Sequence, residues 1–227
     1  MNNKVLLYIY NLFYKLLKEY FIKKYKSELL ESASHFKNSC EVKEVEIHRL
    51  TVPLQMKFKE QNEVISKFGC YFLCILFIGL VVKEIKNSVE KCLDCFEIDL
   101  LFRGLVQKGC LRGDNAYVNS PNAIFSNLGI GEDILFDEKH HPIHYVPTES
   151  DILIGKYRDE SSGFYHFVIL NNDLTVIWDS LGNSKTVSNG NLDSLRVFKI
   201  QNKAIAEHVK NRLEFYSAKF RNNLKEA

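Results

Sequence analysis

The sequence lacks an uninterrupted apolar run long enough to cross a bilayer. The first run, residues 5–13, is short and is followed by lysines rather than by a small-residue cleavage site, so we do not expect a cleaved secretion signal. The second run, residues 68–82, contains no charged residue but is also shorter than the roughly 20 residues that a spanning helix needs. We therefore expect a cytoplasmic protein in which residues 68–82 form a buried helix.

Strong net charge is also missing, and cysteine is sparse. The 30 basic and 28 acidic residues leave a formal net charge of +2, which gives no reason to expect a nucleic-acid partner. Six cysteines in 227 residues are too few for a disulfide scaffold in a chain that can build its own core. One close pair, Cys92 and Cys95, is weak evidence for zinc, because a structural site needs four ligands. We expect reduced thiols, no metal and no cofactor.

A histidine cluster is the other motif typical of metal binding. His140, His141 and His144 lie close together in the sequence. Pro142 prevents a helical presentation of these side chains, and no carboxylate or thiol is fixed beside them. A solvated loop explains the cluster more simply.

The N-terminal region is more basic than the rest of the chain. Residues 1–26 carry six lysines and a single acid, Glu19. Apolar residues recur at three- and four-residue intervals through residues 4–31, which predicts an amphipathic helix. Such a helix can cover its own core, dock on a partner or lie on a membrane surface, and the sequence leaves these readings open. We assign residues 1–50 to this helix and a linker, and residues 51–227 to the main domain.

The main domain begins with helical patterns and ends with β-prone ones. Residues 68–82 and 96–106 have the spacing of helices. Turn residues follow Gly109, and from Asp151 onward short β-prone runs alternate with turn signals. The expected strands are residues 152–157, 164–170, 175–179 and 195–200, and a final helix is expected at 203–219. This order predicts an α+β domain with N-terminal helices packed on a C-terminal antiparallel sheet.

Cys70 stands near the expected start of the apolar helix, directly after Gly69. The unpaired N–H groups and the dipole at a helix start stabilise an anion, and therefore favour a reactive thiolate. The backbone N–H of Cys70 is also a candidate donor to an oxyanion. The alternative is that Cys70 is a small buried core residue, which is what most unpaired cysteines are.

His166 and Asp179 belong to two β-prone runs on either side of Asn172 and Asp173. If those two residues are the turn of an antiparallel hairpin, paired positions have numbers that sum to 345, as 166 and 179 do. The two side chains then face each other at about 5 Å between Cβ atoms. A lone histidine in an apolar strand is more often a core residue. With a carboxylate opposite it and Cys70 at a helix start, the chain supplies the nucleophile, base and orienting group of a thiol triad.

Three segments carry a resemblance to a known superfamily. They are Gly-Cys-Tyr at residues 69–71, Tyr-His-Phe-Val at 165–168 and Trp-Asp-Ser-Leu-Gly-Asn-Ser at 178–184. Their order resembles papain-like cysteine peptidases of the Cys-His-Asp type, including the C39-like branch. Residues from about 60 to 200 are more closely similar to an uncharacterised family of spirochaete plasmid and prophage proteins. The resemblance implies a papain-like fold with Cys70 as nucleophile, His166 as base and Asp179 as third residue.

The chain departs from the superfamily pattern at the oxyanion hole. Papain-like enzymes usually have a glutamine about six residues before the cysteine, and this chain has Val64 there. The nearest candidates are Gln61 and Asn62. The leading hypothesis is a cysteine peptidase or amidase that hydrolyses an amide in a peptide or protein through a thioester. The alternative is an inactive papain-like binding module whose N-terminal helix docks a partner or a membrane surface.

Overall fold

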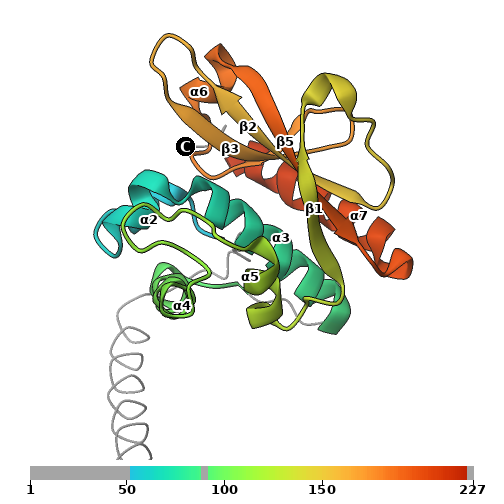
Figure 1. Cartoon of the computed structure of the whole chain (residues 1–227), viewed down its shortest axis with the longest axis horizontal. Helices are drawn as coiled ribbons and strands as arrows, with labels where there is room; N and C mark the ends of the chain where they lie inside the picture. Colours follow the sequence, from blue (N-terminus) through green and yellow to red (C-terminus); the bar gives the residue numbers. More distant parts are fainter. Residues whose placement is uncertain (1–51, 88–91, 224–227) are drawn as a thin grey trace, which may run out of the picture. The chain divides into compact units, whose positions relative to one another are not determined.

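The computed structural model describes residues 52–87 and 92–223 (Figure 1). These residues belong to one compact unit, Arg49–Ala227. The predictions for residues 1–50, including the amphipathic helix and its linker, lie outside the described residues.

Helices form the first half of this domain. A short 3₁₀ helix η1 (Gln55–Phe58) and α2 (Glu63–Phe68) lead into α3 (Cys70–Asn87), which is followed by α4 (Cys95–Gln107) and α5 (Pro121–Leu128). The helices α3 and α4 confirm the two that the apolar spacing predicted. Helix α5 was not expected, because its segment looked rich in turn residues. Those residues are its start signal: Ser120 caps the helix by accepting from the N–H of Ala123, and Pro121 is the first helical residue.

Strands form most of the second half. They are β1 (Ile134–His140), β2 (Asp151–Arg158), β3 (Tyr165–Leu170), β4 (Val176–Asp179) and β5 (Asn191–Ile200). They make one antiparallel sheet in the order β1-β5-β2-β3-β4. The connections contain η2 (Pro142–His144) and α6 (Lys185–Asn189), and α7 (Lys203–Asn223) follows the sheet. The fold is therefore α+β, as predicted. Strand β1 was missed because only Ile134 is fully buried in it, so it shows no clear alternation.

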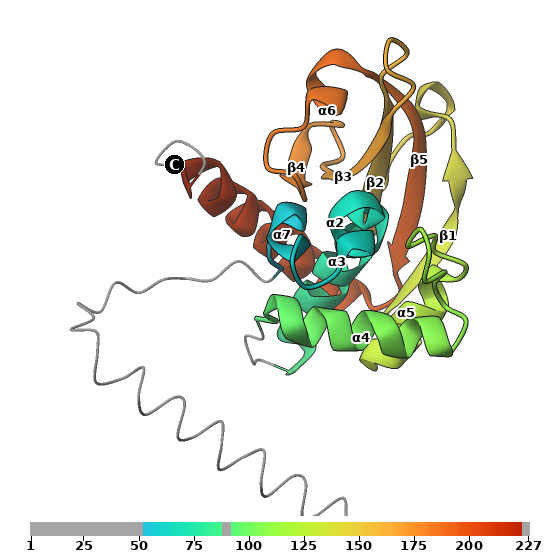
Figure 2. The ribbon, with the colours of Figure 1, turned by 90° about the vertical axis from the view of Figure 1, so that its left-hand side faces the viewer.

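Helix α3 lies at the centre of the core. Its Phe77 ring stacks on Trp178 of β4 at 4.7 Å between centroids and meets Tyr216 of α7 edge-on at 5.9 Å. Figure 2 shows α3 and α7 against the sheet, with α4 farther from the strands. The apolar run thus forms a buried helix, which begins at Cys70. No helix among the described residues is both long and apolar enough to cross a membrane.

The register predicted for the β3–β4 hairpin is wrong by two residues. Val168, and not His166, pairs with Asp179. A shift of two residues keeps side chains on the same face, whereas a shift of one would have moved them to opposite faces. His166 and Asp179 therefore still share a face, as diagonal neighbours.

Two local features together produce this shift. The turn contains three central residues, 172–174, because the N–H of Asn171 donates to the carbonyl of Thr175 at 2.8 Å. Leu174 adopts a positive φ of 65° in this turn. In β4 the register then shifts between the Ile169–Trp178 and Leu170–Val176 pairs, which leaves Ile177 as the extra residue of a β-bulge. Each feature adds one residue, so their sum restores the original face.

Candidate active site

Cys70 begins α3 at a break between two helices. The N–H of Gly69 still donates to the carbonyl of Ile65 in α2, at 2.9 Å, while the carbonyl of Gly69 accepts from Leu73 in α3 at 2.8 Å. A Cβ atom on Gly69 would stand only 2.5 Å from the Ile65 carbonyl oxygen. A residue without a side chain is therefore needed directly before the cysteine for the two helices to meet at this angle.

The first N–H groups of α3 have no carbonyl partner. Within the described part of the chain, no backbone carbonyl accepts from the N–H of Cys70, Tyr71 or Phe72, and the regular helix bonds begin at Leu73. This is the usual state of a helix start, and it concentrates the positive end of the dipole beside the Cys70 side chain. The N–H of Cys70 is thus available as a donor to an anion.

His166 and Asp179 form a short, buried hydrogen bond. The distance from His166 Nε2 to Asp179 Oδ1 is 2.6 Å, and each residue is only 4% exposed. Because the contact occupies Nε2, Nδ1 is the ring nitrogen that remains for a second partner. The contact places the carboxylate where an orienting group would need to be.

The segment after β4 folds around the Asp179 carboxylate. Its Oδ1 atom also accepts from the N–H of Leu181 at 2.8 Å, and Oδ2 accepts from the N–H of Ser184 at 2.9 Å. Gly182 allows this tight path with a φ of 86°. Burial raises the pKa of Asp179, but the hydrogen bond and charge of His166, together with these N–H donors, lower it further than burial raises it. The carboxylate is therefore held ionised.

Cys70 also acts on the imidazole, through its effect on the pKa. Burial lowers the pKa of His166, whereas its side-chain hydrogen bonds to Asp179 and Cys70, and the charges of both, raise it; the result is about 9. A raised pKa favours the imidazolium form, which in turn stabilises a thiolate beside it. The structure thus brings together all three residues proposed from the sequence, with His166 in the middle.

Cys74, one turn further along α3, shows the contrasting environment. Its side chain is fully buried and its Sγ lies 3.4 Å from the carbonyl oxygen of Phe167. Burial raises the pKa of the Cys74 thiol well above its ordinary value, and the charges of Cys70 and Asp179 raise it further. Cys74 is therefore a core residue.

The other oxyanion candidates occupy different environments. Gln61 is exposed in the turn before α2. Asn62 caps that helix, accepting from the N–H of Ile65 at 3.0 Å and donating to Asp99 at 2.7 Å. Capping is thus the role that the structure shows for Asn62. Val64, at the position where papain-like enzymes have glutamine, is half-buried and packs against the core.

Gln55 is a structural part of the site that the sequence analysis did not identify. It is 3% exposed, and its Nε2 donates to the carbonyl of Ser66 in α2 at 3.0 Å. Its Oε1 accepts from Ser180 Oγ at 2.9 Å, and its N–H donates to the Ser180 carbonyl at 2.7 Å. Gln55 therefore ties the helix before the cysteine to the residue after Asp179. No motif or spacing in the sequence marks it.

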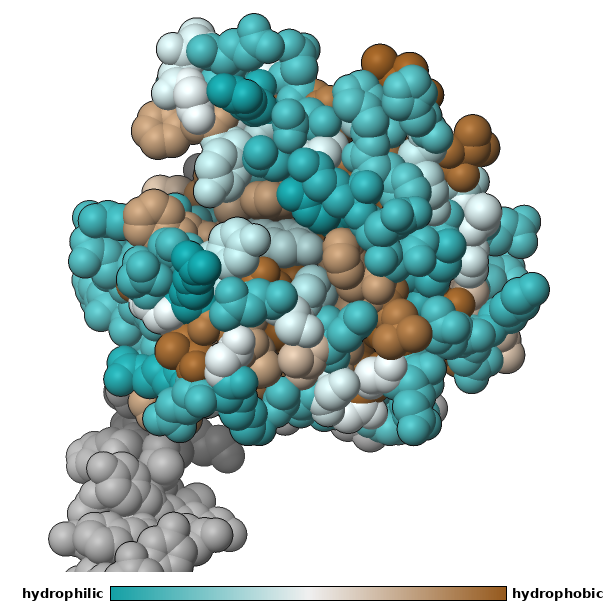
Figure 3. All heavy atoms as spheres, in the orientation of Figure 1, coloured by the Kyte–Doolittle hydropathy of each residue, from teal (hydrophilic) through white to brown (hydrophobic). Residues whose placement is uncertain are grey.

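A groove of about 550 Å³ opens beside Cys70. On the face drawn in Figure 3, the surface is hollowed between the strands and the helices. The groove is lined from α2 and α3, from the connection that leads to α5, and from β1, β2, β3 and β5. Its lining residues are Phe68, Cys70, Tyr71, Asn115, Ala116, Tyr117, Val118, Asn119, Pro121, Phe136, Lys156, Tyr165, Phe167 and Arg196. Its size is that of a ligand pocket.

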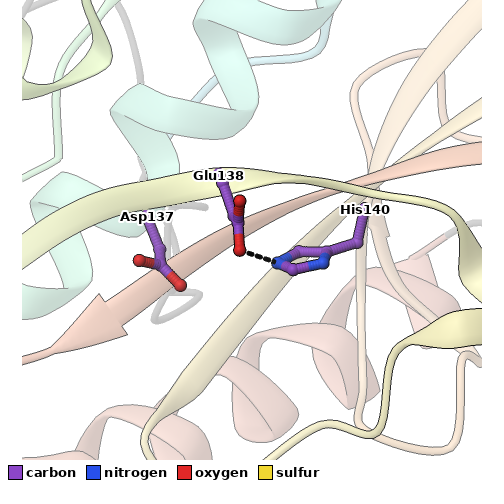
Figure 4. A group of neighbouring side chains, drawn as sticks. All are labelled: Asp137, Glu138 and His140. Atoms are coloured by element: carbon purple, nitrogen blue, oxygen red, sulfur yellow. Dashed lines mark ion pairs between the residues drawn. The ribbon is translucent and has the colours of Figure 1, made fainter.

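A group of polar side chains on β1 lies outside this site. Figure 4 shows Asp137, Glu138 and His140, whose potential ligand atoms lie within 4.8 Å of one another. Asp137 already pairs with Lys199 at 2.7 Å, and His140 pairs with Glu138 at 3.1 Å. These ion pairs account for the cluster. His140 was expected in a loop but is the last residue of the strand.

Comparison with known proteins identifies the family. The model of a family described as "Protein of unknown function, DUF261" matches residues 56–200, which is more than half of the chain. The chain belongs to this family. The DUF261 match contains Cys70, His166 and Asp179 and every residue that lines the groove, whereas α7 lies beyond it. No curated protein and no solved structure matches the chain.

Proposed function

We propose that this DUF261 protein is a papain-like cysteine hydrolase that cleaves an amide bond in a peptide or protein. The observation that carries the proposal is the buried hydrogen bond of 2.6 Å that fixes the His166 imidazole on Asp179. Cys70, at the start of α3, is close enough to help raise the pKa of that imidazole. A helix that begins at the nucleophile and packs against an antiparallel sheet is consistent with a papain-like arrangement. The groove beside Cys70 supplies room for a substrate.

The proposed reaction proceeds by acyl transfer. The Cys70 thiolate attacks the amide carbonyl carbon, and a tetrahedral oxyanion forms next to the N–H of Cys70. The carbon–nitrogen bond then breaks as His166 donates its proton to the leaving amine, which leaves a thioester. Water attacks the thioester, gives a proton to His166 and releases the acid, and the sulfur departs as a thiolate. No cofactor or metal takes part in these steps.

The second candidate is a binding module that has kept the site geometry without catalysis. The observation that favours it is Val64, an apolar side chain packed against the core where papain-like enzymes have an oxyanion-binding glutamine. Losing one oxyanion donor costs about 10²–10³ in rate in enzymes where it has been removed. Turnover, and not thiol reactivity, therefore separates the two candidates.

The first test compares the cysteines of the intact chain with one another. Cys92 and Cys95 are half-buried and more exposed than Cys70, which is 7% exposed. If exposure alone set the rate, iodoacetamide would modify Cys92 and Cys95 first. Activation by His166 reverses this order, so we expect Cys70 to react at least about tenfold faster at neutral pH. Peptide mass spectrometry at short reaction times measures each rate.

Matched variants complete this test. His166→Ala should slow the alkylation of Cys70 while leaving that of Cys95 unchanged, because Cys95 lies on α4. Hydrolysis of a mixture of peptides by the wild type, and not by Cys70→Ala, would identify an enzyme. Selective alkylation without any Cys70-dependent hydrolysis would favour the binding module, and alkylation of Cys70 no faster than that of Cys95 would overturn the nucleophile assignment.

The basic N-terminal segment is the second part of the proposal. Its six lysines and apolar periodicity suit an anionic membrane surface or a partner. Vesicle co-sedimentation of the full chain and of a chain without residues 1–31, with anionic and neutral lipids, measures membrane binding. We expect binding to anionic vesicles that weakens with salt and is lost on truncation. No sedimentation with anionic vesicles at low salt would exclude the membrane.

A further inference from the structure

The groove beside Cys70 carries basic side chains and no acidic one among the described residues that line it. Its two basic residues are Lys156 and Arg196. Lys156 already has a counter-ion, with Nζ 3.3 Å from Asp193 Oδ2. Arg196 donates only to the neutral Ser194 hydroxyl, at 2.9 Å, and no carboxylate of a described residue lies within ion-pairing distance of its guanidinium. Among the described residues, Arg196 is therefore a half-buried cation with no carboxylate in direct contact, and the Ser194 hydroxyl that it binds donates in turn to Asp193 Oδ2 at 3.0 Å.

Arg196 lines the same groove as Cys70. Its guanidinium carbon lies 5.5 Å from the centre of the Phe167 ring, and that ring stacks against Tyr71 at 4.6 Å. Tyr71 directly follows Cys70 at the start of α3, and Phe167 lines the groove with both of them. Burial raises the pKa of Tyr71 and the charge of Arg196 lowers it, so the guanidinium acts electrostatically on the residue next to the nucleophile.

The walls of the groove suit a peptide. Phe68, Tyr117 and Tyr165 line it, and each is more than half exposed. Exposed aromatic side chains that gather around a hollow are typical of a binding surface. A guanidinium at such a site presents a planar fork of donors that matches the two oxygens of a carboxylate. The Arg196 fork has only one of its donors committed, to Ser194.

We propose that the substrate is an acidic peptide whose carboxylate binds Arg196 and thereby places the scissile amide at Cys70. This inference rests on the proposed function and names its substrate class. The carboxylate belongs either to an aspartate or glutamate side chain or to the free C-terminus of the peptide. Both have the same chemistry, and the experiment below distinguishes them.

Two alkylating agents test the charge preference without requiring turnover. Iodoacetate and iodoacetamide form the same carbon–sulfur bond with Cys70 and release iodide, but only iodoacetate carries a carboxylate. The measured quantity is the ratio of the two rate constants at Cys70 in the full chain at low salt. We expect Arg196→Gln to lower this ratio on the order of fivefold, because it removes one positive charge near the sulfur. Added salt should lower the wild-type ratio in the same direction.

Two further variants control for charge and for folding. Arg196→Lys keeps the charge and should retain most of the iodoacetate preference. Lys203→Gln removes an exposed charge at the start of α7, which does not line the groove, and should leave the ratio unchanged. Far-ultraviolet circular dichroism of each variant confirms that it is folded.

Competing peptides then identify the source of the carboxylate. Three peptides of one sequence protect Cys70 from iodoacetamide to different extents: a neutral peptide with blocked ends, the same peptide with one glutamine replaced by glutamate, and the neutral peptide with a free C-terminal carboxylate. We expect one of the two anionic peptides to protect at a concentration at least about fivefold lower than the neutral peptide, and to lose this advantage in Arg196→Gln.

The outcomes separate this inference from the proposed function. If Cys70 reacts no faster than Cys95, the proposed function fails. If Cys70 is selectively reactive but the rate ratio is the same in Arg196→Gln and the wild type, only the acidic-substrate inference fails. It also fails if neither anionic peptide protects better than the neutral one.

Discussion

The protonation of His166 should set an alkaline limit on amide hydrolysis. Burial lowers the pKa of His166, and its contacts with Asp179 and Cys70 raise it to about 9. The imidazolium must donate a proton to the leaving amine, so the rate should follow the protonated fraction. It should be halved near pH ~9 and fall about tenfold for each further pH unit. Alkylation of Cys70 needs only the thiolate, and therefore should not decline over the same range.

The substitution Asp179→Asn shifts this limit in a predictable direction. It removes the negative charge that raises the pKa of His166 but leaves the burial that lowers it. The net rise above the ordinary value of 6.5 corresponds to roughly 3 kcal/mol, and Asp179 and Cys70 together supply this amount and also offset the lowering by burial. We therefore expect the alkaline limit to move down by about one pH unit. The variant should stay more active than His166→Ala, because the asparagine oxygen can still accept from the imidazole.

The assay is the pH dependence of kcat/KM for peptide hydrolysis, measured beside the rate of iodoacetamide alkylation. Wild type and Asp179→Asn are compared in the same buffers and at constant ionic strength. An alkaline limit at the same pH in both proteins would refute the assignment of Asp179. A decline of alkylation in parallel with hydrolysis would show that the limit reflects unfolding or loss of the thiolate.

Three other predictions concern the framework of the site. Gly69→Ala should slow Cys70 alkylation and lower the free energy of unfolding by about 1–3 kcal/mol, because the added Cβ meets the Ile65 carbonyl oxygen at 2.5 Å. Gly104→Ala in α4 is its control, since nothing lies within 4 Å of the new Cβ, and it should be neutral or stabilising in the same urea titration. Glu84→Ala should lower the free energy of unfolding by about 3 kcal/mol, because buried Glu84 pairs with Arg212 and accepts from the Tyr216 hydroxyl at 2.9 Å. These contacts join α3 to α7, and an unchanged midpoint of urea unfolding would contradict the prediction. Finally, the raised pKa of His166 should stabilise the fold fully below pH 6.5, the ordinary pKa of histidine, and this stabilisation should be lost as the pH rises through about 9. In denaturant titrations, Cys70→Ala should make the free energy of unfolding less dependent on pH.

Long and strongly patterned elements could be predicted from the sequence, and weakly patterned ones could not. Helix α3 and strands β2, β3 and β5 contain continuous apolar runs or clear alternation, and they were found within a few residues of their ends. Strand β1 lies at an edge of the sheet and is largely exposed, so its pairing with β5 depends on partners that no local pattern reveals. The predicted fold class is therefore more reliable than the predicted list of elements.

The contact between His166 and Asp179 was predicted from a register that the structure corrects. The sequence argument assumed a two-residue turn and a regular ladder. The actual hairpin has a turn longer by one residue and a bulge at Ile177. Each of them shifts the pairing by one residue, and a total shift of two leaves both side chains on the same face. Had only one of them occurred, the imidazole and the carboxylate would have pointed to opposite faces. The residue types were thus a better guide to the site than the assumed geometry.

Arg196 and Gln55 could not be identified from the sequence because tertiary structure alone brings them to the site. Arg196 lies on β5, which pairs with β2 and so stands only two strands from His166 on β3. No local sequence pattern indicates that β5 pairs with β2, because β3 and β4 lie between them in the sequence. Gln55 lies in a 3₁₀ helix before the recognisable motifs, and its importance depends on contacts with residues 11 and 125 positions away.

The contacts of Gln55 help to explain how Cys70, from one end of the domain, is placed near a histidine and an aspartate from the other. Its side chain joins α2, which leads into Cys70, to Ser180, which follows Asp179. The Asp179 carboxylate then holds His166, whose pKa Cys70 helps to raise. A buried polar network of this kind is costly unless each group is satisfied, which favours a single arrangement of the three reacting side chains. The hydrogen bonds of Gln55 and Asp179 therefore join the helix before Cys70 to the strands that carry His166 and Asp179, and the groove beside Cys70 remains open to a substrate.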